Sequence, residues 1–422
     1  MKRFMLFIAM VGFVATSCSK TIVKDEVETA ISFSTESAKL TRAIVQNNPD
    51  PNIVNGGVYF TNQPFGVFAY SHQKDAAGNV IPEKTTKVMD NVEVYYDDET
   101  DANNPVWRAS GDVKYYWPND PRTSMDFYAF SPACSTANVT KTLAAHQQLN
   151  GTVDHTEADG FSLTDYSHGN MYVDFMLATP VKGATYVNPD GSNDNDVDGV
   201  VPMVFNHKMT QIVFDVTTDN VYPGVKFTVE EITLKNIVSK GTYTCKADGT
   251  QAWAYANQPP KTNYTIFPAN TTNGAVPPIN NAVENNVEKP LVIDYITSTP
   301  TSPAKVTTTG VTMIPQNMTQ TEIPYEAGSD ALANESDAQV FMIKYSISGT
   351  GVAKETVTKH IPFWPSEEDI DKQGPGYVYG VVNWNINKRI TYKVMIGLNE
   401  VTFEPSVADW SNEGGNEYTF KQ

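Results

Sequence analysis

The residue spacing that best matches a known metal-binding pattern is a run of alternating aspartates. Asp194, Asp196 and Asp198 precede Gly199, in the order that opens a calcium-binding loop whose alternate oxygen ligands wrap the ion. Such a loop closes with a bidentate glutamate, and Phe205 stands at that position here. This departure favours a solvated acidic loop. We therefore expect no metal site and retain the three aspartates only as weak candidates.

The other titratable residues show none of the patterns that catalysis requires. The six histidines are scattered along the sequence, without paired metal-ligand spacing, a nucleophile elbow or a glycine-rich phosphate loop. His207 stands at the start of a strand-like run, which is typical of a hydrogen-bonded structural histidine. Carboxylates are abundant, but the sequence places no two of them across a cleft. We predict that the protein is not an enzyme and uses no cofactor.

The amino terminus carries residues that could be cleaved and modified. Lys2 and Arg3 precede an apolar run over residues 4–15 that is too short to span a bilayer and is typical of a secretory signal. Residues 15–18 resemble a bacterial lipobox, although Ala15 replaces the usual leucine. We expect a signal peptide over residues 1–17 and a lipid on Cys18 that holds the precursor at the outer membrane. A soluble secreted protein is the alternative.

Charge and cysteine content narrow the class of protein further. Loss of Lys2 and Arg3 with the signal changes the formal charge from −18 to −20. An exported protein this acidic is a poor partner for nucleic acid. Cys134 and Cys245 are the only other cysteines, too few for a disulfide framework in a chain of this length. We expect two buried free thiols, with a disulfide between them as the alternative.

Arg42 follows a short strand-like stretch and offers a site for proteolysis. Ile31 and Phe33 alternate with Ser32 and Ser34, the period of two that a half-buried strand requires. The chain then becomes polar, and Arg42 has no obvious packing role.

Similar alternating runs extend along the whole chain and predict an all-β protein. Asn, Thr, Val, Gly, Pro and Tyr recur, as expected for strands and turns. The length exceeds one ordinary core, so we expect two domains divided near residue 205. The best short helix candidate is 140–149, and 188–199 and 269–290 read as loops. The predicted strands are 64–71, 91–98, 112–118, 124–132, 211–218, 225–237, 340–348, 377–386 and 390–398.

Six motifs in this order resemble the fimbrillin family of Bacteroidales, the lipoprotein pilins of type V pili. They lie at residues 31–43, 115–132, 173–179, 201–216, 313–316 and 374–410. The resemblance implies two transthyretin-like β-sandwich domains in tandem, which we place at 43–205 and 206–422 after a propeptide over 18–42. It also implies assembly with other fimbrial subunits into a surface fibre.

The resemblance further implies processing by an arginine-specific protease at the Arg42–Ala43 bond. The cut would remove residues 18–42 with the strand that holds Ile31 and Phe33. Loss of this edge strand would expose unpaired backbone groups and an apolar groove, which a strand from a neighbouring subunit could fill. An uncut arginine in an exposed linker is the alternative.

The carboxyl-terminal segment is the candidate for that incoming donor strand. For residues 390–398, a role as the last strand of their own domain is an equal alternative, whereas residues 401–410 favour donation. The donor candidates are Ile390, Tyr392, Val394, Ile396, Leu398, Val401, Phe403, Val407 and Trp410.

A second function class also fits the sequence. Exposed aromatic side chains can act as stacking platforms, so the protein could be a glycan-binding surface lipoprotein that does not polymerise. The candidate platforms are Trp107, Trp117, Trp253 and Trp364.

Overall fold

The computed structural model describes residues 30–37, 64–97, 106–111, 113–134, 149–171, 173–186, 199–267, 283–284, 287–288, 291–296, 303, 305–308, 310–319, 338–363, 383–398 and 401–410. Within these ranges the chain forms strands, turns and extended connections, and it contains no helix. Accordingly, this part of the chain has no helix long and apolar enough to cross a membrane. The prediction of an all-β protein is confirmed.

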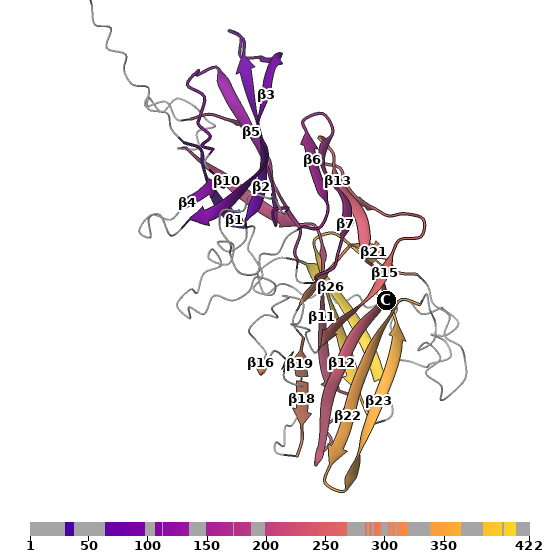
Figure 1. Cartoon of the computed structure of the whole chain (residues 1–422). Helices are drawn as coiled ribbons and strands as arrows, with labels where there is room; N and C mark the ends of the chain where they lie inside the picture. The colour runs from indigo at the N-terminus through magenta and orange to yellow at the C-terminus, as the bar shows by residue number, and fades with distance from the viewer. Residues whose placement is uncertain are drawn as a thin grey trace, which may run out of the picture.

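Eight strands form a sheet that closes on itself, which we call the ring sheet (Figure 1). Because β2 pairs with both β3 and β5, the path from β2 through β3, β4, β1, β10, β8 and β5 returns to β2, and β9 extends it from β5. The strands are, in spatial order, β2 (Phe65–Lys74), β3 (Val80–Asp97), β4 (Val106–Ala109), β1 (Ser32–Ser37), β10 (Val200–His207), β8 (Met176–Ala178), β5 (Thr123–Ser131) and β9 (Val181–Ala184).

A four-stranded sheet covers one face of the ring sheet and draws on both halves of the chain. Its order is β14 (Gln251–Ala254), β13 (Lys240–Cys245), β7 (Gly160–Ser167) and β6 (Thr152–Thr156). Phe68 and Phe130 of the ring sheet share a buried cluster with Phe161 and Tyr243 of this sheet. The rings of Phe130 and Phe161 lie 5.4 Å apart. The hairpin β13–β14 therefore packs with strands that precede residue 205.

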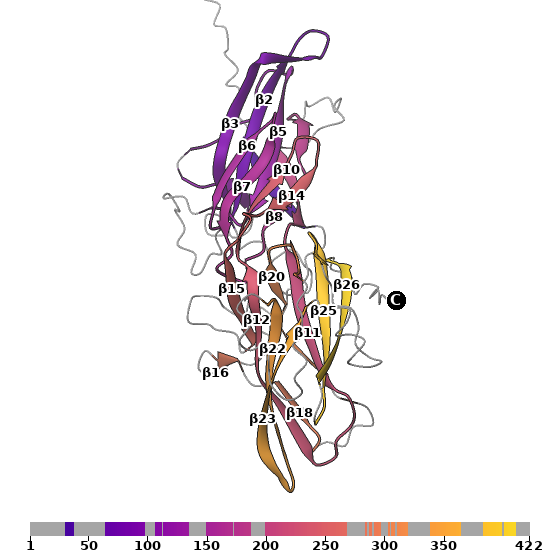
Figure 2. The ribbon, with the colours of Figure 1, turned by 90° about the vertical axis from the view of Figure 1, so that its right-hand side faces the viewer.

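Two five-stranded sheets form the other end of the molecule, which we call the C-terminal sandwich (Figure 2). The first sheet has the order β19 (Lys305–Thr307), β11 (Thr210–Thr218), β25 (Lys388–Ile396) and β26 (Val401–Asp409), with β20 (Val311–Met313) also paired to β11. The second has the order β15 (Lys261–Phe267), β12 (Val225–Val238), β22 (Val340–Gly349) and β23 (Val352–Pro362), with β18 (Leu291–Asp294) also paired to β12. Two short pairs, β16 (Val283–Glu284) with β17 (Val287–Glu288) and β21 (Gln316–Asn317) with β24 (Asn383–Trp384), complete the described strands.

Apolar residues at alternate positions explain why the two five-stranded sheets face each other. In β25, Ile390, Tyr392, Val394 and Ile396 are fully buried and alternate with half-buried residues. They join a single buried cluster with residues of β12 and β22, such as Phe341. A strand with this period buries one face.

Most of the predicted strands are present, and one is wrong. The described strands cover most of 64–71, 91–98, 124–132, 211–218, 225–237, 340–348 and 390–398. Residues 113–118 form no strand: Tyr116 makes one isolated bridge, to Ala30. Val113 is 60% exposed and Tyr116 37% exposed while Trp117 is buried, so the side chains do not alternate as in a strand. The helix candidate apart from Leu149, the predicted loop 188–199 apart from Gly199, and nearly all of 269–290 lie outside the described residues. The predicted strand 377–386 also lies mostly outside them, and of its described residues only Asn383–Trp384 form a strand, β24.

Candidate functional site

The first strand fills a seam between two strands that lie far away in the sequence. β1 pairs in parallel with β10 over six residues, from Ser32 opposite Val200 to Ser37 opposite Phe205. On its other side it meets β4 at one pair only, Phe33 opposite Trp107. The expectation that the first strand is an edge strand is therefore wrong: β1 is an inner strand of the ring sheet, paired along its length with β10 and at one residue with β4.

Aromatic packing holds β1 in place. Phe33 is 3% exposed and meets Phe65 and Phe127 edge-to-face, with ring centroids 5.9 and 6.0 Å away. Ile31 is buried in the same cluster. Burial of each such side chain contributes about 1.5–3 kcal/mol. Phe33 within β1 and Ile31 just before it therefore hold this six-residue strand in the intact chain. Among the described contacts of β1, no helix and no second sheet adds to this packing.

The carbonyl group of a glycine fixes the start of β1 through hydrogen bonds. Gly199 has φ of +78°, in the left-handed region that favours glycine. Its carbonyl oxygen accepts hydrogen bonds from the backbone N–H and hydroxyl of Ser32, at 3.2 and 3.1 Å, and from Nε1–H of Trp117 at 3.3 Å. The backbone N–H of Ile31 donates to the carbonyl of Tyr115 at 2.8 Å.

The last strand, β26, lies at an edge of the C-terminal sandwich (Figure 2). It pairs with β25 along its whole length, from Val401 opposite Ile396 to Asp409 opposite Lys388, and with no other described strand. Pro405 lies in the middle of β26 and lacks a backbone donor, a feature of edge strands. β25, in contrast, is an inner strand, parallel to β11 on its other side.

The end of β26 is fixed at the junction between the two ends of the molecule. Trp410 is 2% exposed and stacks on His207 at 3.8 Å with an angle of 7° between the rings. Nδ1 of His207 lies 2.7 Å from Oδ2 of Asp174 in a buried pair. His207 is thus a hydrogen-bonded histidine as expected, but it lies at the end of β10 and not at the start of a strand.

The structure separates the predicted donor residues into two groups. Ile390, Tyr392, Val394 and Ile396 lie in inner strand β25, the arrangement of the alternative in which this segment belongs to its own domain. Leu398 is 44% exposed. In edge strand β26, Val401 and Val407 are half-buried, and Phe403 stands opposite Val394.

Several predicted site residues lie outside the described part of the chain. These are Cys18, Arg42, Ala43, Asp194, Asp196 and Asp198. Among the cysteines that the structure describes, Cys134 is buried and Cys245 is half-buried, and both are free. Burial raises the pKa of Cys134 to about 11.

The tryptophans offer little support for a glycan platform. Trp107 and Trp117 are buried in the core of the ring sheet. Trp253 is half-buried, and its Nε1–H donates to the carbonyl of Lys208 at 2.9 Å. Trp364 lies outside the described residues. A surface hollow of about 530 Å³ between the β6–β7 and β13–β14 turns has Phe161 as its aromatic lining residue.

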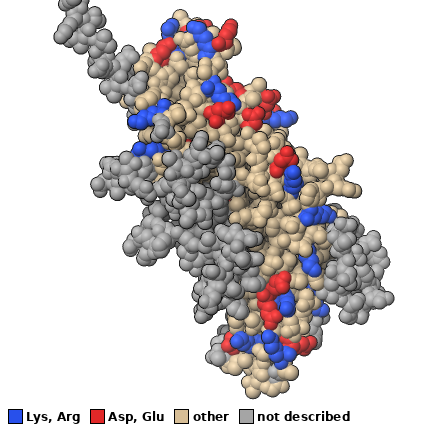
Figure 3. Space-filling view, viewed as in Figure 1, with Lys and Arg blue, Asp and Glu red and all other residues tan. Residues whose placement is uncertain are grey.

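On the face shown in Figure 3, basic and acidic side chains are interspersed along the described part of the surface, so charge marks out no binding patch in this view. Strand edges and the apolar seam are the other features that could recognise a partner.

Sequence reasoning missed how these elements meet. The parallel pairing of β1 with β10 joins residues nearly 170 positions apart, and the alternation within each strand does not identify its partner. The stacking of Trp410 on His207 likewise has no local signal in the sequence.

Comparison with known proteins adds an independent result. The family model described as fimbrillin-like matches residues 41–410. No curated protein matches the chain. Among similar solved structures, a fimbrial protein from Bacteroides vulgatus is 18% identical, with a TM-score of 0.46 over 90% of this chain and 100% of that one. The tip fimbrial protein Mfa3 from Porphyromonas gingivalis, solved with a C-terminal truncation, is 10% identical, with a TM-score of 0.26 over 83% of this chain and 96% of that one. Because the family model spans most of its length, the chain belongs to the fimbrillin-like family.

Proposed function

We propose that this protein is a structural and adhesive subunit of a type V-like surface fimbria that polymerises by strand exchange. Its family supports a fimbrial subunit role, association with other fimbrial subunits and a place at the cell surface. The observation that carries the exchange step is the position of β1, which closes the ring sheet with one fully paired side and one side paired at a single residue.

Cleavage after Arg42 would turn β1 into a separate peptide. Arg42 lies five positions after the last residue of β1, within the stretch that joins β1 to β2. After the cut, β1 would be held by its ladder with β10 and by Ile31 and Phe33. Its departure would expose the backbone edge of β10 and an apolar groove beside Phe65 and Phe127, which favours entry of another strand.

β26 is the better-placed donor, because an edge strand can leave without opening the middle of its sheet. Its nine residues exceed the six of β1, so it is long enough to fill the seam. Val401, Phe403 and Val407 occupy alternate positions opposite the buried side chains of β25. The same spacing of two separates Ile31, the residue just before β1, from Phe33 in β1.

The precursor is exported as a lipoprotein in this proposal. A lipid on Cys18 holds the chain at the outer membrane until an arginine-specific protease cuts at the Arg42–Ala43 bond. Because residues 18–42 carry both the lipid and β1, one cut releases the anchor and opens the seam.

The test compares the wild-type chain with two variants in cells that assemble the fimbria. Arg42→Ala removes the cleavage site, and Arg42→Lys keeps the charge but not the arginine that the protease recognises. We expect wild-type fibres to begin at Ala43 and to run as SDS-resistant ladders. Both variants should remain unpolymerised with a blocked, lipid-modified amino terminus. Normal ladders from Arg42→Ala would overturn the proposal.

A further inference from the structure

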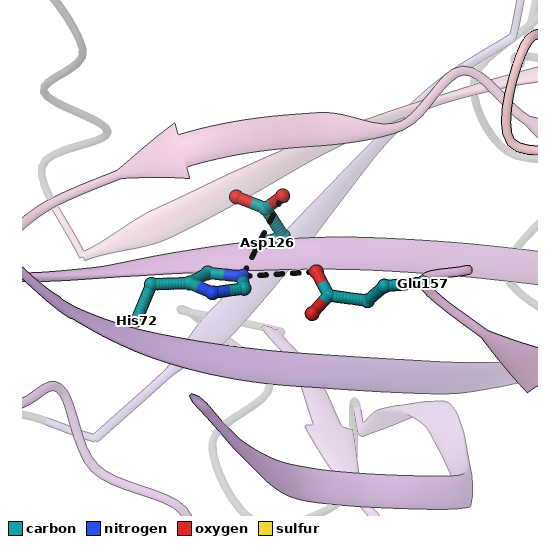
Figure 4. Close-up of side chains that lie close together, drawn as sticks. All are labelled: His72, Asp126 and Glu157. Carbon is teal, nitrogen blue, oxygen red and sulfur yellow. Dashed lines mark ion pairs between the residues drawn. The ribbon is translucent and has the colours of Figure 1, made fainter. Parts of the chain in front are cut away.

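We propose that His72, Asp126 and Glu157 form a zinc-binding site on the face of the ring sheet that the four-stranded sheet covers. His72 lies on β2, Asp126 on β5, and Glu157 in the turn that joins β6 to β7. The three side chains converge from these elements (Figure 4). The proposal is independent of strand exchange, because none of the three residues contributes to the seam.

The distances between ligand atoms match a small tetrahedral ion. Nε2 of His72 lies 2.9 Å from Oε1 of Glu157 and 3.7 Å from Oδ2 of Asp126. The ligand atoms of all three residues lie within 4.8 Å of one another. Zinc holds nitrogen and carboxylate oxygen ligands at about 2.0–2.2 Å, so adjacent ligands of a tetrahedron are about 3.3 Å apart. The two measured separations fall on either side of that value.

The imidazole is oriented as a metal ligand. His72 is 8% exposed, and its Nδ1 lies 3.1 Å from the hydroxyl of Thr85. When Nδ1–H donates to that hydroxyl, Nε2 presents a lone pair towards the two carboxylates. Nε2 is fully buried and makes no hydrogen bond of acceptable geometry within the described residues. A proton on Nε2 could serve only one of the two carboxylates at a time, whereas a metal cation between the three electron-pair donors would bind all of them at once.

The positions of the two carboxylates are also compatible with metal binding. Oδ1 of Asp126 accepts a hydrogen bond from the backbone N–H of Gly183 at 2.6 Å, which leaves Oδ2 directed at His72. Such bonds from outside the ligand set orient metal ligands. The Glu157 side chain is 28% exposed, so the site is open to solvent on one side.

The chemistry of the ligands selects zinc over the common hard cations. One nitrogen and two carboxylates, with a fourth position for water, suit zinc. Calcium takes six to eight oxygen ligands, and magnesium demands an octahedron and keeps several waters. The two carboxylates with a neutral imidazole carry a charge of −2, which a dication neutralises. The bound ion would fasten the tip of the β6–β7 hairpin to β2 and β5.

Zinc titration of the full-length, chelator-treated chain tests the site. We expect one ion per chain by calorimetry, with little response to calcium or magnesium alone. Glu157→Gln should weaken zinc binding at least tenfold, whereas Asp159→Asn, which alters a carboxylate in the same turn outside the cluster, should leave it unchanged. Thr85→Val should weaken it about tenfold through loss of the bond that orients His72.

A second measurement separates zinc at this site from zinc held elsewhere. Cobalt as a spectroscopic substitute should give the strong visible bands of a tetrahedral site in the wild-type chain and in Asp159→Asn, but not in His72→Asn. Far-UV circular dichroism without metal should show that all variants are folded. Absence of zinc binding, or zinc binding that survives both His72→Asn and Glu157→Gln, would show an ordinary histidine–carboxylate pair and overturn the proposal.

Discussion

At the scale of single residues, we expect Phe33 to be the side chain that contributes most to holding β1 in its seam. It contacts both Phe65 and Phe127 from a strand that has one well-paired neighbour. The alternation of Ile31 and Phe33 with serines indicated from sequence which face would be buried. The partners of Phe33 could not be predicted, because they come from β2 and β5.

Phe33→Ala should release the first strand faster once the chain is cut. Truncation of a buried phenylalanine costs about 3–5 kcal/mol of stability. This is a large part of the free energy that keeps a six-residue strand bound. After limited trypsin treatment of the precursor, size-exclusion chromatography and mass spectrometry would show how much of the amino-terminal fragment stays bound. Ser34→Ala is the matched control. Equal retention of the fragment in both variants would refute the role of Phe33.

His168 should make the protein sensitive to acid. Its ring is buried, with Nδ1 2.8 Å from the Tyr166 hydroxyl and Nε2 2.7 Å from the carbonyl oxygen of Thr312. Burial lowers the pKa of His168 to about 4. The unfolded chain therefore binds a proton below about pH 6.5 while the folded chain does not. The free energy of unfolding should then fall by about 1.4 kcal/mol per pH unit between pH 6.5 and 4.

Urea unfolding at pH 7 and pH 5 would check this expectation. His155 has a pKa lowered to about 4, also by burial, and contributes in the same direction. The free energy of unfolding of His168→Gln should therefore still fall between pH 7 and pH 5, but by less than that of the wild-type chain. An unchanged difference between the two pH values would mean that His168 does not titrate on unfolding.

At the scale of elements, the contrast between β25 and β26 matters most. Both are strand-like in sequence, and alternation predicted residues 390–398 well. Alternation cannot show that β25 has neighbours on both sides while β26 has one, because that depends on β11 and its parallel pairing. Pro405 was the one local signal of an edge.

The same limit explains the wrong strand at 112–118. Val113, Tyr115 and Trp117 stand at alternate positions, but the segment passes the start of β1 and makes a single bridge there. The alternating spacing of apolar residues led to the prediction of a strand. That spacing does not show whether a partner strand lies alongside, and a strand needs one.

A disulfide between β25 and β26 should block polymerisation reversibly. Thr391 and Ser406 are register partners. Opposed residues of antiparallel strands have Cα atoms about 4.5–5.5 Å apart, within the range that a disulfide spans. In a chain with Cys134 and Cys245 replaced by serine, Thr391→Cys with Ser406→Cys should polymerise only after reduction.

Each single cysteine variant is the control and should polymerise under both conditions. Ladders of equal intensity from the oxidised and reduced double variant, with the disulfide verified by mass spectrometry, would exclude β26 as the donor.

At the scale of the whole molecule, the ring sheet and the C-terminal sandwich form one elongated body (Figures 1 and 2). Several contacts join its two ends. Trp410 stacks on His207, and the Tyr264 hydroxyl donates to the carbonyl of His168 at 2.6 Å. The hairpin β13–β14 also reaches from the second half of the sequence to β7. The sequence led us to expect a domain boundary near residue 205. The packing of hairpin β13–β14 against strands on the other side of that boundary leaves no local pattern in the sequence.

Trp410→Ala should loosen β26 and the junction together. Removing a buried aromatic side chain costs about 3–5 kcal/mol of stability. Trp410 directly follows β26 and fixes its end by stacking on His207. Hydrogen exchange should become faster along 401–409 and near His207, with little change in β22. Trp410→Phe, which keeps an aromatic ring for stacking, should show a smaller effect. Uniformly faster exchange across the sandwich would indicate global destabilisation instead.

The central claim is that the seam between β4 and β10 is filled by the chain's own first strand before assembly and by a neighbour's strand afterwards. The most direct measurement is a structure of the assembled fibre at a resolution that identifies side chains. We predict that residues 401–410 of an adjacent subunit occupy the seam and that residues 31–37 are absent. Density for Ile31 and Phe33 of the same chain, still between β4 and β10 in the fibre, would contradict the account.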